Sequence, residues 1–432
     1  MNRNICPVIS GFLAAILLAS CAQGNGSSKI EDETAKTEGP EKTTAENAYT
    51  YNFLCDSMLF SAGATTDEGF YDLVLNLDGT GNIIYYDYAT RRCVYLSDQI
   101  NSLHRDESDT SFFESFIGGA DILSDGNYLY ILKQTNRYLL ENDDKRGSGY
   151  IYRMDLDGNH RKAIPLPANM YIYPTSGIAS VDSTLCFLVL ETQKDSSDAT
   201  KLIQVDFEHN KIKEIMTFSD QISPFLVGSC ESGLIFSTND HTLKEQTLQL
   251  LDFQTMQLSR VPFDADNAEY RIDSSSGNIY YIPSAKDEIW AYNIITQTNE
   301  LLRFELPMEE YDHAAFAEKT VDNKVLLKLS NTRTGEYKNI ALDLCSGKTY
   351  EQELMDGDHP VSIYGVAEDS YLVMLSSIEA EYQDYTPDGV PAENTMLLPH
   401  FALIKKEDYW LNRPNYHEFD NQVYNKMKMS VR

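Results

Sequence analysis

Residues that could carry enzyme chemistry are present in this sequence, but none stands at the spacing of a known catalytic or metal-binding motif. Gly228 to Gly233 reads G-S-C-E-S-G and misses the G-x-S-x-G spacing of a hydrolase nucleophile. The acidic run Asp155–Asn159 has its glycine at position 4, where a calcium loop needs it at position 6, and it lacks a glutamate at position 12. No His-Glu-x-x-His pair and no phosphate-binding glycine loop occurs. The sequence therefore predicts no catalytic residue, no metal ligand and no cofactor. Catalysis stays open, because an active site assembled from separate loops leaves no linear motif.

The histidines support the same interpretation. They are scattered along the chain, mostly at predicted turns, and we expect each to be a solvated turn residue and not a base or a ligand. They are His104, His160, His209, His241, His313, His359, His400 and His417.

One residue does have a context that indicates chemistry, and it is Cys21. Val8–Leu18 is apolar apart from Ser10, but it is shorter than the about 20 residues that a membrane-spanning helix needs. It is typical of a signal-peptide core. The four residues Leu18–Cys21, which begin with the last residue of this core and read Leu-Ala-Ser-Cys, resemble the lipobox of bacterial lipoproteins at every position. The resemblance implies cleavage before Cys21, a lipid such as palmitate on its thiol, and display on the extracytoplasmic side of the cell membrane or the outer membrane. The alternative is an ordinary secretory signal that ends in a cysteine.

The composition changes sharply after Cys21. Residues 22–49 are polar and small, and Ile30 is their only aliphatic side chain larger than alanine. Such a segment buries too little surface to fold, and we expect a flexible tether with an end-to-end distance of about 30 Å. We therefore divide the chain into a signal peptide (1–20), a lipidated cysteine with its tether (21–49), a folded body (50–419) and a C-terminal tail (420–432).

The charge balance narrows the range of partners. The chain of 432 residues has 35 Lys and Arg against 66 Asp and Glu, a formal charge of −31. A nucleic-acid partner is disfavoured because binding depends on cations that neutralise phosphates. Cationic peptides, metal ions and basic protein faces remain open, beside the simpler explanation that the charge keeps the protein soluble.

Five cysteines remain once Cys6 and Cys21 are set aside. No two are close in sequence and no zinc-like pairing appears, although one disulfide would be compatible with the number. We expect Cys93, Cys186 and Cys345, which lie in strand-like runs, to be small buried hydrophobic residues.

A repeated unit dominates the remainder of the chain. An apolar strand ends in Asp or Asn, a short polar turn follows, and a second strand begins. Before most of these hairpins lies another pair of short strands, joined through Asp, Ser, Asn or Gly. The residues that end the marker strand are Asp87, Asp155, Asp206, Asp252, Asn293, Asp343 and about Lys405, the last in a looser copy that leads to Tyr409–Leu411.

Four strands in each repeat of about 40 to 50 residues are typical of a β-propeller. A single four-stranded sheet cannot bury both faces, whereas stacked blades can. We count seven units between about Phe53 and Phe419, with six or eight left open. The sequence therefore predicts an all-β, seven-bladed propeller. A solenoid and a pair of β-sandwiches are the alternatives.

One hairpin also resembles known blades. Tyr152–Lys162 reads Y-R-M-D-L-D-G-N-H-R-K and looks like blades of the low-density-lipoprotein-receptor-type and TolB-like propellers. The match is degenerate in the other units, and those families usually have six blades. The resemblance implies a binding or scaffold propeller, and it carries over no functional residue. Asp155 and Asp157 are expected to be turn and strand-end residues.

Two insertions widen the repeat. Gln134–Gly149 lengthens the second unit and mixes charges, and Glu379–Asn394 is acidic with two tyrosines, Tyr382 and Tyr385. Exposed tyrosines beside carboxylates can hold a peptide or a sugar, so we take these two as candidate ligand residues. The simpler expectation for the second insertion is a long solvated loop.

Three functions are compatible with these observations. The first is a lipid-anchored binding or scaffold module for a protein, peptide or glycan. The second is an extracytoplasmic hydrolase or lyase with its site at the propeller channel, which needs converging titratable groups there. The third is a structural role in an envelope assembly.

Overall fold

The structure is a computed structural model, and it describes residues 49–56, 63–76, 79–97, 99, 102–284, 286–317, 320–356, 359–385, 391–420 and 423. The chain forms two compact units, of which the second, Tyr49–Arg432, contains all the described residues. This unit is all-β with very little helix. No helix among the described residues is long and apolar enough to cross a membrane.

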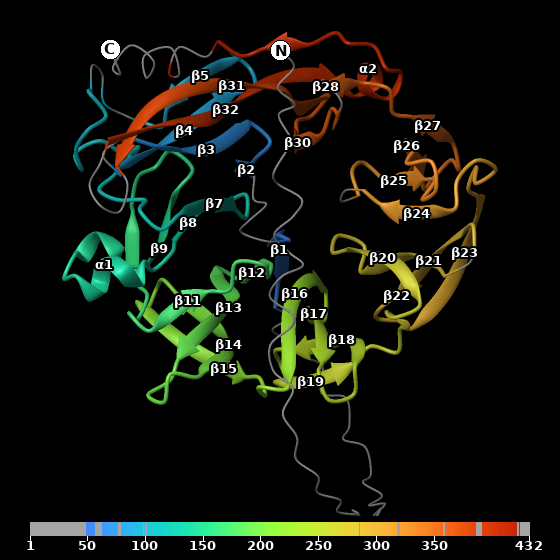
Figure 1. The fold of residues 1–432 in the computed structure, drawn as a ribbon, viewed down its shortest axis with the longest axis horizontal. Helices are drawn as coiled ribbons and strands as arrows, with labels where there is room; N and C mark the ends of the chain where they lie inside the picture. Colours follow the sequence, from blue (N-terminus) through green and yellow to red (C-terminus); the bar gives the residue numbers. More distant parts are fainter. Residues whose placement is uncertain are drawn as a thin grey trace, which may run out of the picture. The chain divides into compact units, whose positions relative to one another are not determined.

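The second unit is a seven-bladed propeller, which confirms the predicted fold class (Figure 1). Each blade is built on four consecutive antiparallel strands, and the first strand of each faces the centre of the ring. The strands of the first four blades are β2 (Ala64–Thr65), β3 (Gly69–Leu75), β4 (Gly81–Asp87) and β5 (Arg92–Tyr95); β7 (Ala120–Ser124), β8 (Tyr128–Lys133), β9 (Tyr150–Asp155) and β10 (Lys162–Pro165); β12 (Ile178–Val181), β13 (Thr184–Thr192), β14 (Asp198–Asp206) and β15 (Lys211–Thr217); and β16 (Ile222–Cys230), β17 (Gly233–Asp240), β18 (Glu245–Asp252) and β19 (Gln257–Arg260).

The last three blades repeat this order, and a few short elements lie beside the blades. Blades 5 to 7 are β20 (Ala268–Asp273), β21 (Asn278–Pro283), β22 (Glu288–Asn293) and β23 (Thr298–Glu305); β24 (His313–Phe316), β25 (Lys324–Ser330), β26 (Tyr337–Asp343) and β27 (Thr349–Glu351); and β30 (Ile363–Val366), β31 (Ser370–Tyr385), β32 (Pro391–Lys405) and β33 (His417–Glu418). The additional elements are β6 (Phe112–Phe113) beside β4, β11 (Met170–Ile172) beside β13, the hairpin β28 (Met355–Asp356) with β29 (His359–Pro360), the helices α1 (Arg137–Glu141) and α2 (Lys406–Trp410), and the 3-10 turn η2 (Lys145–Gly147).

The marker residues of the sequence repeat end the third strand in every blade, and in five of them the side chain also caps the turn that follows. The Oδ1 atom of Asp206 accepts hydrogen bonds from the backbone N–H groups of Glu208 and His209, which closes the turn. Asn210, four residues after the marker, then has a left-handed φ of 49°. The same arrangement, an Asx side chain followed by a left-handed residue, occurs after Asp87, Asp240, Asp252, Asn293, Asn331 and Asp343.

The first described strand, β1 (Tyr51–Cys55), does not belong to the first blade. It pairs antiparallel with β12, the innermost strand of blade 3, and it lies near the centre of the ring between β12 and β16 (Figure 1). Gly177 accommodates it, because a Cβ atom there would come within 2.5 Å of the Phe53 ring. The sequence repeat began at about Phe53, so this part of the prediction was wrong: β1 pairs with a strand more than 120 residues away.

Blades 7 and 1 close the ring through side-chain packing and through two backbone hydrogen bonds of Asp420, and among the described residues they do not exchange a strand. Phe401 and Phe419 pack edge-on against Tyr86 of blade 1, with ring centroids 5.2 and 5.3 Å away. The backbone N–H of Asp420 donates to the carbonyl of Arg91, and Val423 is buried in the same cluster. Residues after β33 therefore contribute to closure.

Two local expectations from the sequence were wrong. Tyr409 and Trp410 were expected in the outer strand of blade 7, but they lie in α2 and are buried together with ring centroids 4.8 Å apart. The outer strand is β33 instead. Cys345 was expected to be buried, but it is exposed, because it lies in the turn after β26 and its N–H donates to Asp343. Cys93 and Cys186 are buried, as predicted.

Candidate functional site

A cleft of about 770 Å³ opens at the outer side of blades 1 and 2. Three segments form its walls: residues 107–115, which connect the two blades; the insertion between β8 and β9, which contains α1 and η2; and the β9–β10 hairpin. In Figure 1, α1 lies at the outside of blade 2. The cleft thus brings together the first insertion and the blade-like Tyr152–Lys162 run, two features that the sequence had marked separately.

Side chains within the insertion cap the N-termini of its two short helices, α1 and η2. The Asn136 side chain accepts a hydrogen bond from the Leu139 N–H at the start of α1, and the Asp144 side chain accepts one from the Arg146 N–H at the start of η2. Asp144 also forms an ion pair with the Arg146 guanidinium at 2.6 Å. These contacts fix the conformation of the wall, and the charge of Arg146 is paired with that of Asp144.

Lys133 lies at the end of β8 beneath this wall and is only 2% exposed. Its Nζ donates to the carbonyl oxygens of Arg146 at 2.7 Å and Ser148 at 2.5 Å. Among the described residues no carboxylate forms an ion pair with it. Burial lowers the pKa of Lys133 to about 8, so the ammonium is largely protonated at neutral pH.

Arg161 supplies a second cation to the cleft. Its guanidinium lies 3.7 Å from the centre of the Phe113 ring, and it donates to the carbonyl oxygens of Phe112 at 2.8 Å and Thr110 at 2.6 Å. Burial lowers the pKa of Arg161, and the nearby charges of Tyr152, Glu107 and Asp109 act in the opposite direction. Within the described part of the chain, no carboxylate oxygen lies within ion-pair distance of this guanidinium.

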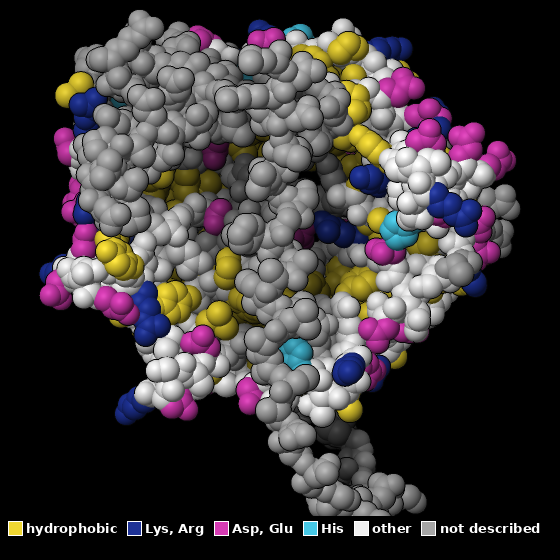
Figure 2. Space-filling model, in the orientation of Figure 1, with side chains coloured by type: hydrophobic (Ala, Val, Ile, Leu, Met, Phe, Trp, Pro, Cys, Tyr) yellow, Lys and Arg dark blue, Asp and Glu magenta, His cyan; other side chains and the backbone are white. Residues whose placement is uncertain are grey.

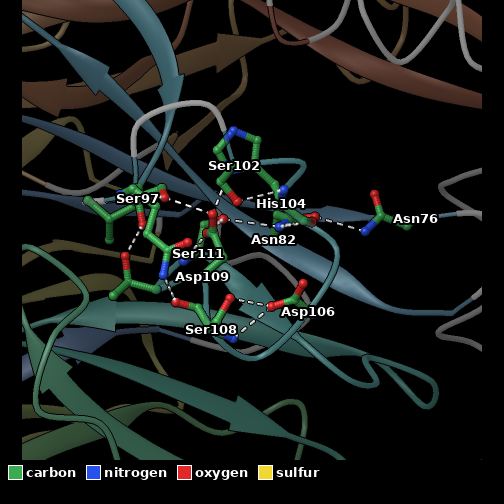
Figure 3. A network of polar contacts seen from close by, with 12 residues as sticks. Asn76, Asn82, Ser97, Ser102, His104, Asp106, Ser108, Asp109 and Ser111 are labelled. Carbon is green, nitrogen blue, oxygen red and sulfur yellow. Dashed lines mark hydrogen bonds and ion pairs between the residues drawn. The ribbon is translucent and has the colours of Figure 1, made fainter.

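A network of polar side chains braces the wall that carries Thr110 and Asp109 (Figure 3). Asp109 is buried and accepts hydrogen bonds from the Ser97 hydroxyl at 2.7 Å and from the hydroxyl and N–H of Ser111 at 2.6 and 2.9 Å. The Oδ2 atom that accepts from Ser97 also lies 2.8 Å from His104 Nδ1. Burial acts to raise the pKa of Asp109, but hydrogen bonds from Ser102, Ser111 and Ser97 outweigh it and hold the pKa well below its usual range.

His104 was expected to be a solvated turn residue, and the structure corrects that expectation. It has a left-handed φ of 54°, lies half-buried between Asp109 and the stacked ring of Tyr95, and its carbonyl accepts a hydrogen bond from Asn82. His160 and His209 are exposed at turns, where Asp155 and Asp206 contact them. The run of Ser, Asp and Asn near His104 predicts turns, but nothing in its spacing marks one buried aspartate as their common acceptor.

The centre of the ring contains β1. Asp56, directly after β1, forms an ion pair with Arg271 on the inner strand of blade 5, so the segment reaches from blade 3 to blade 5. Tyr49 and Tyr51 pack against Phe253 of blade 4.

Two carboxyls, those of Asp72 in β3 and Asp121 in β7, lie between blades 1 and 2. Burial raises the pKa of each to about 7, and the charge of Asp72 raises that of Asp121 further.

A second cleft, of about 590 Å³, lies between blades 5 and 6. Its lining includes four acidic residues, one lysine, Lys286, and one histidine, His313. Acidic side chains are in fact spread around the rim of the face in Figure 2, with Lys and Arg between them. The cleft at blades 1 and 2 contains one buried cation, Lys133, beside the half-buried Arg161.

The remaining predicted site residues are Tyr382, Tyr385 and Cys21. Tyr382 and Tyr385 lie in β31, paired with Asn394 and Pro391 of β32, so the second insertion extends a hairpin where a solvated loop was expected. Cys21 lies outside the described residues, as do the signal peptide and tether. No group of three or more His, Cys, Asp or Glu side chains that could hold a metal ion occurs among the residues described.

Comparison with known proteins yields likenesses of fold. No family model and no curated protein sequence matches the chain. Among solved structures, the chain is similar to an oligogalacturonate lyase from Vibrio parahaemolyticus (14% identity, TM-score 0.47, covering 83% of this chain and 92% of that one). It is also similar to TolB from Acinetobacter baumannii (12%, 0.35, 84% and 78%) and to the β-propeller domain of the Trilobed protease from Pyrococcus furiosus (12%, 0.41, 81% and 98%). The assignment of a propeller rests on this chain's own strand order. The lipobox and the receptor-type resemblance stay predictions.

Proposed function

We propose that this protein is a lipid-anchored, extracytoplasmic binding module, and that its ligand occupies the cleft at blades 1 and 2. The observation that carries the proposal is the cleft itself. It is large enough for a small ligand or one end of a larger one. It contains aromatic rings, the buried Lys133 and the half-buried Arg161, and among the described residues neither cation has a carboxylate within ion-pair distance.

The state of the cleft's polar groups favours binding over turnover. The Asp109 carboxylate is saturated by hydroxyl and N–H donors, and the low pKa that results makes it a poor general base. Lys133 and Arg161 are held by main-chain carbonyls, which gives them fixed positions. Fixed cations and braced walls are what a preorganised binding site requires.

The membrane anchor is proposed from the sequence. Lipid on Cys21 and a polar tether over residues 22–49 would keep the propeller attached to the membrane, on its extracytoplasmic side, and accessible to a protein, peptide or glycan partner.

The proposal is tested by applying the chain from residue 22 onward, without its lipid, to arrays of glycans and of peptides. The test variant is Lys145→Ala with Tyr150→Ala, two cleft residues at the surface of the wall, and the matched control is Lys194→Ala, an exposed lysine away from the cleft. We expect the wild type and the control to bind the same ligands and the double variant to lose them. A ligand that the double variant retains unchanged would place the binding site elsewhere.

A further inference from the structure

We propose that one face of the propeller is turned towards the membrane and that the opposite face, which carries both insertions, is presented to partners. The inference rests on the lipid anchor of the proposed function and goes further by orienting the body that the anchor holds. The turn face carries the turns after the first and third strands of each blade, such as residues 182–183 and 253–256. The insertion face carries the connections after the second strands, such as residues 134–149. Because the four strands of each blade are antiparallel, these two sets of connections lie on opposite sides of the ring.

The chain enters the ring from the turn face, as two hydrogen bonds of Thr50 show. β1 runs antiparallel to β12, with Tyr51 opposite Val181, the last residue of β12. The N–H of Thr50 donates to Asp182 Oδ1 at 2.9 Å, and the N–H of Asp182 donates to the Thr50 carbonyl at 2.9 Å. Because Asp182 lies in the turn between the first and second strands of blade 3, Thr50 lies at the turn face.

Aromatic packing against blade 4 independently places the start of the body at the same face. The Tyr49 and Tyr51 rings lie 6.1 and 5.9 Å from the ring of Phe253, which directly follows the third strand of blade 4. β1 lies near the centre of the ring, beside the inner strands β12 and β16 (Figure 1). The predicted tether therefore joins the body near the middle of the turn face.

Both insertions belong to the opposite face. The first, with α1 and η2, connects β8 to β9, and the second extends the hairpin of β31 and β32. Each joins the second strand of its blade to the third, so each begins and ends at the insertion face. The first insertion also forms a wall of the candidate cleft. The side of the propeller with the longest connections is therefore not the side at which the tether joins.

The length of the tether opposes inversion of the body. Residues 22–49 have a relaxed end-to-end distance of about 30 Å, and they reach at most about 95 Å when fully extended. A folded body of about 370 residues has a radius of gyration of about 21 Å, or a radius of about 27 Å if it is treated as a sphere. The path over such a surface from one face to the other is about 80 Å long. With the turn face towards the bilayer the tether stays relaxed, whereas inversion would stretch it close to its limit.

Energy transfer from a dye on the protein to an acceptor on lipid headgroups tests the orientation. The full lipidated chain is purified from membranes, labelled on a surface thiol and added to preformed phosphatidylcholine vesicles that contain the acceptor lipid. The exposed native Cys345 is the probe on the turn face of blade 6. Cys345→Ser with Thr334→Cys moves the thiol to the exposed β25–β26 turn, on the insertion face of the same blade. In blade 4 the matched pair, each with Cys345→Ser, is Thr255→Cys for the turn face and Leu243→Cys for the insertion face.

We expect the dye on the turn face to transfer energy at least about twofold more efficiently than the dye on the insertion face of the same blade, since strands of about seven residues separate the two turns by about 23 Å. Cys345→Ser alone measures the signal from the half-buried Cys55, which is subtracted. Thermal unfolding verifies that each variant folds. Duplication of residues 22–49 should reduce the difference between the faces, because a tether of twice the length reaches around the body without being stretched to its limit.

Equal transfer from the two faces, or more transfer from the insertion face, would overturn the inference and leave the lipid anchor standing. A difference that stays unchanged after duplication of the tether would also overturn it, because the tether would then not be the cause. Cys21→Ser, which lacks the lipid, should stay off the vesicles and show no transfer. If the wild type fails to bind the vesicles, or if Cys21→Ser binds them equally well, the proposed anchor fails and the orientation fails with it.

Discussion

Replacement of Asp72 by asparagine is expected to stabilise the propeller at alkaline pH and to leave its stability nearly unchanged at acidic pH. The carboxyl of Asp72 lies between blades 1 and 2, and burial raises its pKa from 3.8 to about 7. The folded state thus retains a proton that the unfolded chain releases at lower pH. The contribution of Asp72 to the free energy of unfolding of the wild type should therefore be highest below about pH 4, and it should fall as the pH rises towards 7.

The magnitude follows from the rise in pKa. A tenfold change in an ionisation constant corresponds to about 1.4 kcal/mol. The rise in the pKa of Asp72 therefore lowers the free energy of unfolding above pH 7 by at most about 4 kcal/mol. The side chain is still partly exposed, so solvent screening reduces this, and we expect about 1–2 kcal/mol for Asp72→Asn at pH 8. The variant should also lower the pKa of Asp121, since the charge of Asp72 is one cause of its rise to about 7.

Urea denaturation at pH 5 and at pH 8 measures the effect, with the exposed Asp220→Asn as the matched control. Asp72→Asn should show its full gain at pH 8 and only about a third of it at pH 5, because pH 5 lies within the range from about 4 to 7 over which the wild type loses stability. The control should show no gain at either pH. A loss of stability at both pH values would refute the reasoning, because it would mean that the ionised carboxylate is stabilised in the folded state.

Three further predictions concern the turns, the ring closure and the anchor. Met256→Gly should raise the free energy of unfolding by about 0.5–1 kcal/mol, because Met256 has a left-handed φ of 55° that glycine adopts without strain. Gly347→Ala should lower the free energy of unfolding by about 1 kcal/mol, because Gly347 has a φ of 69°. Urea denaturation measures both changes, and changes of the same sign would contradict the prediction. Phe419→Ala should lower the free energy of unfolding by about 3–4 kcal/mol, because the Phe419 side chain is 4% exposed and packs between blades 7 and 1. A decrease below about 1 kcal/mol in the same assay would show that the propeller closes without this side chain. Cys21→Ser should abolish lipid attachment and move the protein from the detergent phase to the aqueous phase in detergent partitioning; partition unchanged from the wild type would rule out Cys21 as the lipid site.

The repeat could be predicted from the sequence because most blades close the turn after their third strand with the same type of residue. An Asp or Asn that ends the third strand caps its own turn, as Asp206 and Asp252 do, and this leaves a mark that does not depend on distant contacts. The buried Cys93 and Cys186 were predictable for a similar reason, since apolar neighbours in a strand imply burial.

The rest depends on long-range contacts. Nothing local in Tyr51–Cys55 indicates that it pairs with β12, and nothing near Tyr409 distinguishes a strand from the short helix α2. The cleft could not be predicted for the same reason. Lys133 reaches it from β8 and Arg161 from the turn between β9 and β10, and the carbonyls that accept from them belong to two further segments. Composition predicts an acidic surface, but not the place where two cations remain without a carboxylate partner among the described residues.

The central claim, that ligands bind in the cleft at blades 1 and 2, is tested most directly by hydrogen–deuterium exchange with and without a ligand found on the arrays. The account predicts slower exchange in residues 107–115 and in the insertion between β8 and β9, with no change in β1 or in β20 and β24 at the second cleft. Protection confined to β1 and the inner strands, or to the β31–β32 hairpin, would contradict it and move the site to the centre of the ring or to the hairpin.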